Sequence, residues 1–362
     1  MEESSSEAFQ HKVVIDGVMM EPRNGSKRRK TDPSKRWFER ARSVLILGDG
    51  DLSFSRSLAE SEPNLPITAT VLDSELEYLT RYGTDMNIKR LRECPNLHLM
   101  FSVDATALSS EWARKFHYIV MNFPHPGGKT NLKKSRQLAS GIFRSVSKIM
   151  GDDSEFHLVL AQGQAGVQHN GGPLWSSTVP AHEKDSWQAL YLAAEEGLLL
   201  ADIMTFSPEE FDGYTSSGYR SSAKGFNNSE GAQRLIFRKS APLKPLGEIS
   251  AFDRPQSGFH ALRPYFQHDV SFLFLDGNVD EGERLAFKLV RELTGSAVVT
   301  VKEVEELRSM CPDPYLPNRI YRLTWQIVEI AVGKRACNDL QEQLREKIQE
   351  AIQDRHLPLI LT

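Results

Sequence analysis

Short apolar runs alternate with stretches of helical spacing between residues 43 and 239. Each run is cut off by glycine or by polar residues, which is typical of buried strands. The spacing of apolar residues between the runs is typical of amphipathic helices. Strands are expected at 43–48, 67–73, 97–106, 117–122 and 155–162, with helices at 53–60, within 76–91 and at 132–150. This alternation predicts a parallel sheet covered on both faces.

Two further strands, at 198–206 and 233–238, follow a helix expected at 186–196. The segment between these two strands has no helical spacing, so we expect them to form an antiparallel hairpin at the edge of the sheet. Alternating strand-helix units that end in a hairpin predict an α/β fold. Its core is a Rossmann-like, seven-stranded sheet of the kind that binds nucleoside cofactors.

The pattern changes after a segment rich in Pro, Ser and Gly at 240–258, which we interpret as a linker. Beyond it, strands are expected at 268–276, 298–307, 319–330 and 357–362, with helices at 280–293 and 338–352. The order β-α-β-β-α-β predicts an α+β, ferredoxin-like domain. The expected organisation is therefore a tail at 1–41, an α/β domain at 42–239, the linker, and a second domain at 259–362.

Composition narrows the function class. The 362 residues carry a net charge of −4, so the protein is not built as one large polyanion-binding surface. No run of eighteen apolar residues and no secretory signal is present, and the three cysteines lack metal-ligand spacing. We expect a cytoplasmic protein without a metal. The basic segment 22–36 leaves open a disordered tail, a nuclear or nucleolar address, and a non-specific RNA clamp.

A glycine turn follows the first strand, in the sequence "LILGDGDLSFS". Gly48 and Gly50 permit a sharp turn and a close approach of the backbone to a ligand. A dinucleotide-binding turn has a third glycine where this chain has Ser53, so a pyrophosphate cradle is disfavoured. The alternative is a tight turn without a ligand. We expect the turn, with Asp49 and Ser53, to bind a cofactor.

Acidic residues end the next two strands. Asp73 stands where a carboxylate can accept both hydroxyls of a ribose, and Asp104 where a carboxylate can accept an adenine amino group. In a parallel sheet these strand ends line one crevice. Each aspartate could instead cap a following helix. With no third glycine and no P-loop, S-adenosylmethionine is a better prediction than NAD or ATP.

The fourth strand ends in "NFPHPGG", residues 122–128. Pro124 and Pro126 lack backbone donors, so the carbonyl groups beside them stay available as acceptors. Asn122 can present its side-chain carbonyl in the same direction, and His125 can accept a proton near neutral pH. Gly127 and Gly128 leave room for a flat ring. The alternative is a rigid turn that carries a surface histidine.

Weaker predictions concern the later loops. Gln162 and Gln164 follow the fifth strand and can border the pocket, although a helix-entry loop is equally possible. The loop between the last two strands carries Tyr219, Arg220 and Lys224, which offer a stacking face and phosphate contacts. A solvated hairpin loop is the alternative there.

Four motifs, in this order, resemble the eukaryotic rRNA uridine-N3 methyltransferase family: "LILGDGDLSFSRSLA", "ITATVLDS", "VDAT" and "IVMNFPHPGG". The resemblance covers about 42–239. It implies a class I methyltransferase that uses S-adenosylmethionine and acts on N3 of a uridine in large-subunit rRNA. The loop "GYTSSGYRSS" differs from that of the fungal enzymes, which is richer in histidine and arginine.

The motifs "RPYFQHDVSFLFLD" and "RIYRLTWQ" resemble the ferredoxin-fold anticodon-binding domain of phenylalanyl-tRNA synthetases. Binding of tRNA does not follow from this resemblance. From His260 to Thr362 there are 13 Lys and Arg against 16 Asp and Glu, and the chain ends in "LPLILT" where the synthetase domain ends in arginine.

The sequence therefore predicts an RNA methyltransferase with Asn122 and His125 at its reaction centre. The flipped uracil would lie between Asn122 and the loop of Tyr219. Two alternatives stay open: a non-catalytic RNA-binding or protein-binding factor that keeps the fold, and a synthetase fragment, for which no adenylate-forming motif is present.

Overall fold

The computed structural model describes residues 38, 42–83, 86–128, 131–167, 171–216, 230–249, 258–304 and 316–362. The first half of the chain forms one large sheet. Its strands are β1 (Val44–Leu47), β2 (Ile67–Thr70), β3 (Leu97–Met100), β4 (Tyr118–Asn122), β5 (Glu155–Leu160), β7 (Leu198–Thr205) and β8 (Gln233–Lys239). They lie side by side in the order β3-β2-β1-β4-β5-β8-β7. The first five are parallel, and β8 runs antiparallel to both of its neighbours. The expected seven-stranded, Rossmann-like sheet with a terminal hairpin is confirmed.

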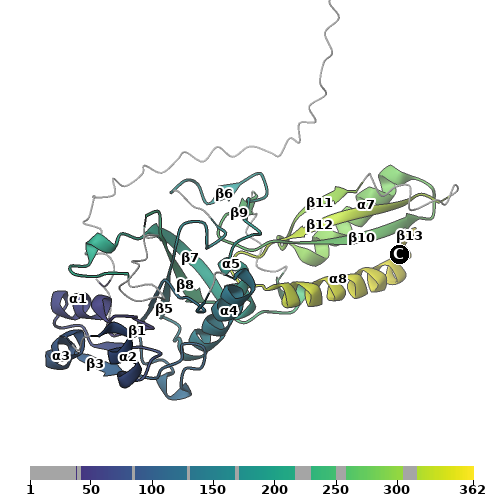
Figure 1. Ribbon diagram of the computed structural model, residues 1–362. Helices are drawn as coiled ribbons and strands as arrows, with labels where there is room; N and C mark the ends of the chain where they lie inside the picture. The colour runs from purple at the N-terminus through teal and green to yellow at the C-terminus, as the bar shows by residue number, and fades with distance from the viewer. Residues whose placement is uncertain are drawn as a thin grey trace, which may run out of the picture. The chain divides into compact units, whose positions relative to one another are not determined.

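Helices connect these strands and cover the sheet. They are α1 (Ser53–Ser61), α2 (Glu75–Tyr82), α3 (Met86–Glu93), α4 (Leu132–Ile149) and α5 (Ala189–Glu195). Figure 1 shows α4 and α5 together on one face. Leu45 and Leu47 of β1 share a core with Phe143 of α4 and Leu190 of α5. Because side chains alternate along a strand, Val44 and Ile46 point to the opposite face, where they are also buried.

The second half forms a smaller antiparallel sheet. Its elements are β10 (Phe266–Phe274), α7 (Val279–Thr294), β11 (Val298–Glu303), β12 (Asn318–Trp325), α8 (Lys334–Asp354) and β13 (Leu359–Leu361). The strand order is β11-β12-β10-β13, and α7 and α8 pack against the sheet over a separate core that includes Trp325 and Leu344. The element order β-α-β-β-α-β and this strand order confirm the expected α+β, ferredoxin-like arrangement.

Three short elements were not expected from the sequence. β6 (Trp175–Ser176) pairs with β9 (Phe259–His260), and α6 (Leu246–Ile249) forms within the expected linker. The buried Leu246 and Ile249 pack into the core of the second sheet. Isolated pairs of strand residues have no hydrophobic period, so sequence pattern does not reveal them. Both sheets belong to the compact unit Arg40–Thr362.

Several strands are shorter than their apolar runs. β2 ends at Thr70, three residues before Asp73, and β12 ends at Trp325 rather than at residue 330. The backbone beyond β2 still bonds to the sheet, since Val71 donates to the carbonyl of Met100 and Val103 donates to the carbonyl of Val71. Among the described residues no helix is long and apolar enough to cross a membrane.

Candidate active site

A cavity of about 400 Å³ opens where the parallel strands end. Its walls come from the glycine turn after β1, the segments after β2 and β3, the loop after β4, and residues 214–216. This size falls in the range of small-molecule sites. Of the predicted site residues, the cavity lining contains Gly48, Asp49, Gly50, Asp73, Asp104, Asn122, Pro124, His125 and Gly127. The sheet therefore brings together residues from five separate segments of the chain.

The glycine turn makes a close backbone approach possible. Gly48 has φ +60°, and a Cβ atom built there would lie 3.3 Å from the terminal methyl group of Met121. A side chain at this position would be strained and would crowd the end of β4. The turn therefore requires glycine at residue 48, as the sequence predicts.

The acidic residues of the turn hold the N-terminus of α1. Leu52 occupies the N-cap position with a left-handed backbone and offers no side-chain acceptor. The carboxylate of Asp49 instead accepts hydrogen bonds from the backbone N–H and the hydroxyl of Ser55, at 2.7 and 2.5 Å. Asp51 accepts from the N–H of Ser53 at 3.0 Å. These two carboxylates satisfy helix-terminal donors that have no partner inside the helix.

The Asp49 carboxyl is buried and has a perturbed acidity. Burial, followed by the nearby charge of Asp51, raises its pKa from 3.8 to about 7, against the lowering effect of the Ser55 hydrogen bonds. Because its oxygen faces Ser55, its observed role is to position the turn and α1. Ser53 was also predicted to bind cofactor, but its hydroxyl is turned to Asp51 and to the backbone of Thr215.

Asp51 is a site residue that sequence reasoning missed. One of its oxygens accepts from the hydroxyl of Ser53 at 2.6 Å, and the other accepts from the hydroxyl of Thr215 at 2.8 Å. The backbone N–H of Thr215 in turn donates to the Ser53 hydroxyl at 3.0 Å. These hydrogen bonds connect Thr215 to the glycine turn.

Asp73 lines the cavity and forms an ion pair with Arg81, at 2.7 Å. It does not cap the helix that follows. Ser74 caps α2, in a capping box with Glu77. The helix-cap alternative for Asp73 is therefore wrong. Arg81, which also lines the cavity, is a second residue that sequence reasoning missed.

Asp104 accepts hydrogen bonds from the N–H and the hydroxyl of Thr106, at 2.8 and 2.7 Å, through one of its two carboxylate oxygens. This is a local turn and not a helix cap, because the next helical turn begins at Ser110 and is capped by Ser109. The Asp104 side chain is exposed at the cavity. Its position at the end of the third strand fits the predicted contact with an adenine amino group.

Asn122 ends β4 with both polar atoms of its side chain buried. Neither atom makes a hydrogen bond of standard geometry among the described residues, although the amide interacts with the hydroxyl of Tyr214. The amide adjoins the Tyr214 hydroxyl, whose pKa it lowers, while burial raises that pKa more strongly. A buried amide without such hydrogen bonds costs free energy and calls for an explanation. A ligand in the cavity would supply them.

The loop after β4 is held in an unusual conformation. Phe123 has φ +48°, a left-handed value that is costly for a residue with a Cβ atom. Its N–H donates to the carbonyl of Val159, and its ring meets Phe206 edge-on at 5.6 Å. These contacts fix the direction in which Pro124 and His125 leave the strand.

The His125 ring contacts its own loop. Its Nδ1 accepts a hydrogen bond from the backbone N–H of Gly127 at 2.9 Å, so the neutral ring carries its hydrogen on Nε2. Partial burial lowers the pKa of His125. Gly127 and Gly128 both have positive φ, and Gly127 lines the cavity whereas Gly128 does not.

Of the remaining predicted residues, some line the cavity and others do not. Gln164 lines the cavity, while Gln162 is exposed and packs against Gly231. The side chain of Gln164 also accepts from the N–H of Ala161 at 3.0 Å, which closes the turn after β5. Tyr219, Arg220 and Lys224 lie outside the described residues. No group of three or more His, Cys, Asp or Glu in the described part of the chain is placed to hold a metal.

Comparison with known proteins agrees with this geometry. Residues 45–218 match the sequence model of the BMT5-like family, described as rRNA (uridine-N3-)-methyltransferase. The ferredoxin-fold anticodon-binding domain-containing protein 1 homolog of Mus musculus is 34% identical over 208 residues, which are 56% of this chain and 32% of that protein. The chain thus spans about a third of the length of this relative.

A second relative is the 25S rRNA (uridine(2634)-N(3))-methyltransferase of Saccharomyces cerevisiae, 25% identical over 49% of this chain and 66% of its own length. Among solved structures, a variant of the 16S rRNA (adenine(1408)-N(1))-methyltransferase from Catenulisporales acidiphilia, with cosubstrate SAM, aligns over 56% of this chain and 88% of its own. Its identity is 15% and its TM-score 0.36.

The residues present fit S-adenosylmethionine. The glycine turn leaves space for a ligand, and the cavity is lined by Asp73 and Asp104, the residues predicted to contact the ribose and the adenine, and by Asn122. Arg81 would have to share the Asp73 carboxylate with the ribose hydroxyls. The resemblance inferred from the motifs is confirmed by the match of residues 45–218 to the BMT5-like family model, and the cofactor that the residues of the cavity fit is S-adenosylmethionine.

Proposed function

We propose that this protein transfers a methyl group from S-adenosylmethionine to N3 of a uridine in RNA, with rRNA as the RNA class. The family matched by residues 45–218 and the name of the yeast relative support the RNA and the uridine. The domain limits of the proposal are 42–239 for the methyltransferase part and 259–362 for the ferredoxin-like part.

The observation that carries the proposal is the buried amide of Asn122, which lies at the carboxyl end of β4 beside the Tyr214 hydroxyl and makes no hydrogen bond of standard geometry among the described residues. The Watson–Crick edge of uracil presents a carbonyl, an N–H and a second carbonyl. A side-chain amide offers both a donor and an acceptor to such an edge. The prolines at 124 and 126 lack backbone N–H groups, so no competing backbone donors stand at these two positions.

Asn122 and the loop would align N3 with the methyl group, and alignment is the main contribution of the protein to transfer. The cofactor supplies an electrophilic methyl group on a sulfonium. Asp73 and Asp104 would hold its ribose and adenine, away from the reacting end. Tyr214, next to Asn122, would restrict the pocket on the side of residues 214–216.

We propose that His125 orients the uracil and that the proton on N3 is released to water, and not to His125, as N3 takes up the methyl group. In the neutral ring Nδ1 already accepts from Gly127, so Nε2 carries a hydrogen and can donate to a uracil carbonyl. If Nδ1 took up a proton it would become a donor that faces the N–H donor of Gly127, and the hydrogen bond between them would be lost. The lowered pKa of His125 is consistent with a ring that stays neutral.

The competing function is a non-catalytic factor that keeps the fold and binds RNA or protein. Titration calorimetry with S-adenosylmethionine separates the two. An enzyme binds the cofactor, and Asp73→Ala abolishes this binding because the ribose hydroxyls lose a charged acceptor. Absence of binding to the unmodified chain, together with no transfer of labelled methyl groups to RNA, would favour the non-catalytic factor.

A further inference from the structure

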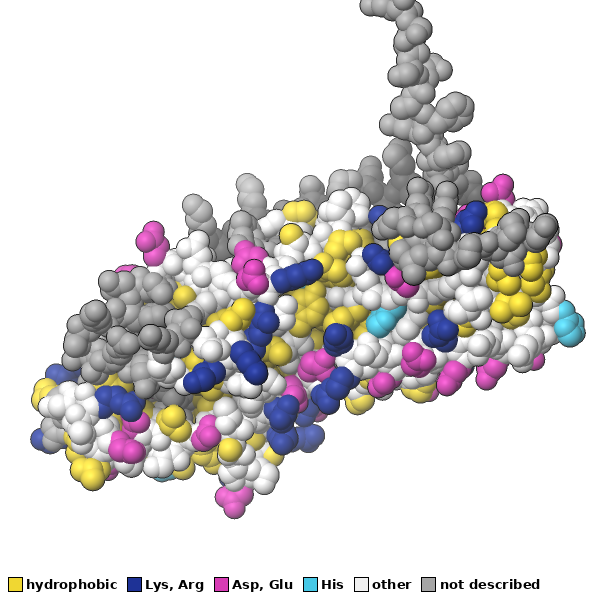
Figure 2. All heavy atoms as spheres, turned by 45° about the vertical axis from the view of Figure 1, so that its right-hand side comes forward, with side chains coloured by type: hydrophobic (Ala, Val, Ile, Leu, Met, Phe, Trp, Pro, Cys, Tyr) yellow, Lys and Arg dark blue, Asp and Glu magenta, His cyan; other side chains and the backbone are white. Residues whose placement is uncertain are grey.

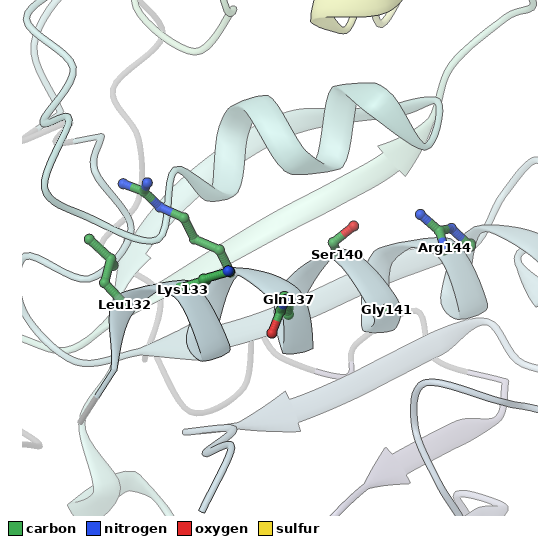
Figure 3. A pocket seen from close by; sticks show the side chains of 7 residues that line it. Leu132, Lys133, Gln137, Ser140, Gly141 and Arg144 are labelled. Atoms are coloured by element: carbon green, nitrogen blue, oxygen red, sulfur yellow. The ribbon is translucent and has the colours of Figure 1, made fainter. Parts of the chain in front are cut away.

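A second concavity runs along the outer face of α4. It is an open groove of about 720 Å³, lined by residues spaced for one helical face from Leu132 to Arg144. Figure 3 shows these side chains distributed along the helix, with Lys133 and Arg144 near its two ends and the small Ser140 and Gly141 between them. At the rise of an α-helix, the stretch from Leu132 to Arg144 is about 18 Å long.

The groove is cationic. Lys133, Arg136 and Arg144 line it, and none of its lining residues is acidic. Arg136 donates to the backbone carbonyls of Ser186, at 2.6 and 2.9 Å, and of Lys184. These acceptors are neutral, so the guanidinium charge is not cancelled by them. Arg144 pairs with Glu196 at 3.1 Å, yet 58% of its side chain stays exposed.

Positive charge is concentrated locally on a chain whose net charge is −4. Figure 2 shows several Lys and Arg side chains, with Asp and Glu side chains among them, across one face of the molecule. A local cluster of cations attracts polyanions without making the whole protein basic. Acidic side chains do stand beside the partners of these arginines, since Glu183 and Asp185 flank Lys184, an acceptor of Arg136, and Glu196 pairs with Arg144.

The groove and the cofactor cavity share one helix. α4 begins at Leu132, four residues after Gly128 of the loop that follows β4. Leu138 lines the cofactor cavity, whereas Lys133, Gln137 and Arg144 line the groove. A polymer that delivers one nucleotide to Asn122 therefore passes the first turn of α4 as it leaves the cavity.

We propose that the groove along α4 binds the sugar-phosphate backbone of the RNA whose uridine enters the cavity. The proposal rests on the function given above. Phosphates recur at regular intervals along a strand, so cations spread over several helical turns can each meet one. The short side chain of Ser140, between Lys133 and Arg144, leaves room for the backbone to approach. Cations that contact phosphates set affinity and orientation and do not read the sequence.

The test is the double variant Lys133→Glu/Arg144→Glu. Its matched control is Arg90→Glu/Arg92→Glu on α3, which brings the same change in net charge. Arg90 and Arg92 are exposed helical arginines that pair with Glu60 and Glu75, as Arg144 pairs with Glu196. Arg136 is left in place because it holds residues 184–186. If the double variant does not fold, the single variant Lys133→Glu is measured in its place, because this change breaks no ion pair found among the described residues.

Binding is measured by fluorescence anisotropy of the full chain with a labelled uridine-containing RNA hairpin, over a range of about 50 to 200 mM salt. At about 100 mM salt we expect the Kd of the double variant to be about tenfold higher. The negative slope of log K against log salt should become shallower by about 1.5. The control should stay within about twofold of the unmodified chain, and calorimetric binding of S-adenosylmethionine should be unchanged in both.

Equal affinity in the double variant and the unmodified chain would overturn the groove proposal while leaving the methyltransferase function intact. It would point to an acidic protein as the occupant of the groove. Loss of affinity of the same size in the control would also overturn it, since any reduction in positive charge would then suffice. Absence of RNA binding by the unmodified chain would remove the proposed RNA substrate and the groove proposal together.

Discussion

The hydroxyl of Thr215 donates a hydrogen bond to Oδ2 of Asp51 at 2.8 Å, and so joins positions 164 residues apart in the sequence. The contact links the glycine turn, which was predicted to bind the cofactor, to the start of the loop that was predicted to contact substrate. Ser53 strengthens the link through its hydroxyl. Hydrogen bonds therefore connect the predicted cofactor site to the start of this loop.

Thr215→Val should weaken cofactor binding by about fivefold, because it removes one hydrogen bond to a carboxylate and loosens a wall of the cavity. Calorimetric titration with S-adenosylmethionine measures the change. Thr178→Val is the matched control, since the Thr178 hydroxyl bonds only to Ser176 among the described residues and lies outside the cavity. An equal loss of affinity in both variants would contradict the proposed link.

Asp49→Asn should flatten the pH dependence of stability. The folded-state pKa of Asp49 is about 7, above its ordinary value of 3.8, so between these values the native state holds a proton that the unfolded state has released. Stability of the unmodified chain then falls as pH rises through this window, by about 1 kcal/mol per pH unit from this group.

Urea unfolding at about pH 5 and about pH 7 tests this expectation. As pH rises, the unfolding free energy of the unmodified chain should fall relative to that of Asp49→Asn, so the variant becomes the more stable of the two by comparison. A difference that is independent of pH would show that Asp49 is ionised across the window, and that its burial does not control its acidity.

Asn122→Leu should lower the rate of methyl transfer by about 100-fold or more without lowering stability, because its buried amide makes no hydrogen bond of standard geometry among the described residues that could be lost. The unfolding free energy should stay equal or rise by about 1 kcal/mol. Asn96→Leu is the contrasting control, since the Asn96 side chain donates to the carbonyls of Glu62 and Leu65. That variant should lose about 2 kcal/mol and keep the transfer rate. Comparable destabilisation of both variants would mean that Asn122 is a structural residue.

His125→Gln separates the two roles considered for the histidine. A glutamine can donate a hydrogen bond to a uracil carbonyl but cannot take up a proton. Transfer in His125→Gln should stay within about tenfold of the unmodified chain, while His125→Ala should lose about 100-fold and still bind cofactor. Single-turnover rates at saturating cofactor give the comparison. If glutamine is as inactive as alanine, the histidine acts as a base.

The sequence was sufficient for the large features of the fold because each depends on a local pattern. Apolar runs located the strands, and the end of each strand located Gly48, Asp73, Asp104 and Asn122, all of which line one cavity. Strand ends in a parallel sheet meet at one edge, so a single-sequence reading can assemble a site from distant residues.

Contacts between distant side chains could not be read in the same way. The pair Asp73–Arg81 and the link Asp51–Thr215 depend on rotamers and on how a loop folds back, and neither has a fixed spacing. The turn after β5 is another example, because the positive φ of Gly163 sets which glutamine faces the cavity. Of the two glutamines predicted to border the pocket, Gln164 lines the cavity and Gln162 does not.

The central claim is tested most directly by incubating the chain with methyl-labelled S-adenosylmethionine and total RNA, and then separating the nucleosides of the digested RNA. The account predicts label in 3-methyluridine, and its absence when Asn122→Leu replaces the unmodified chain. Label in any other nucleoside, or label in 3-methyluridine that persists in Asn122→Leu, would contradict it.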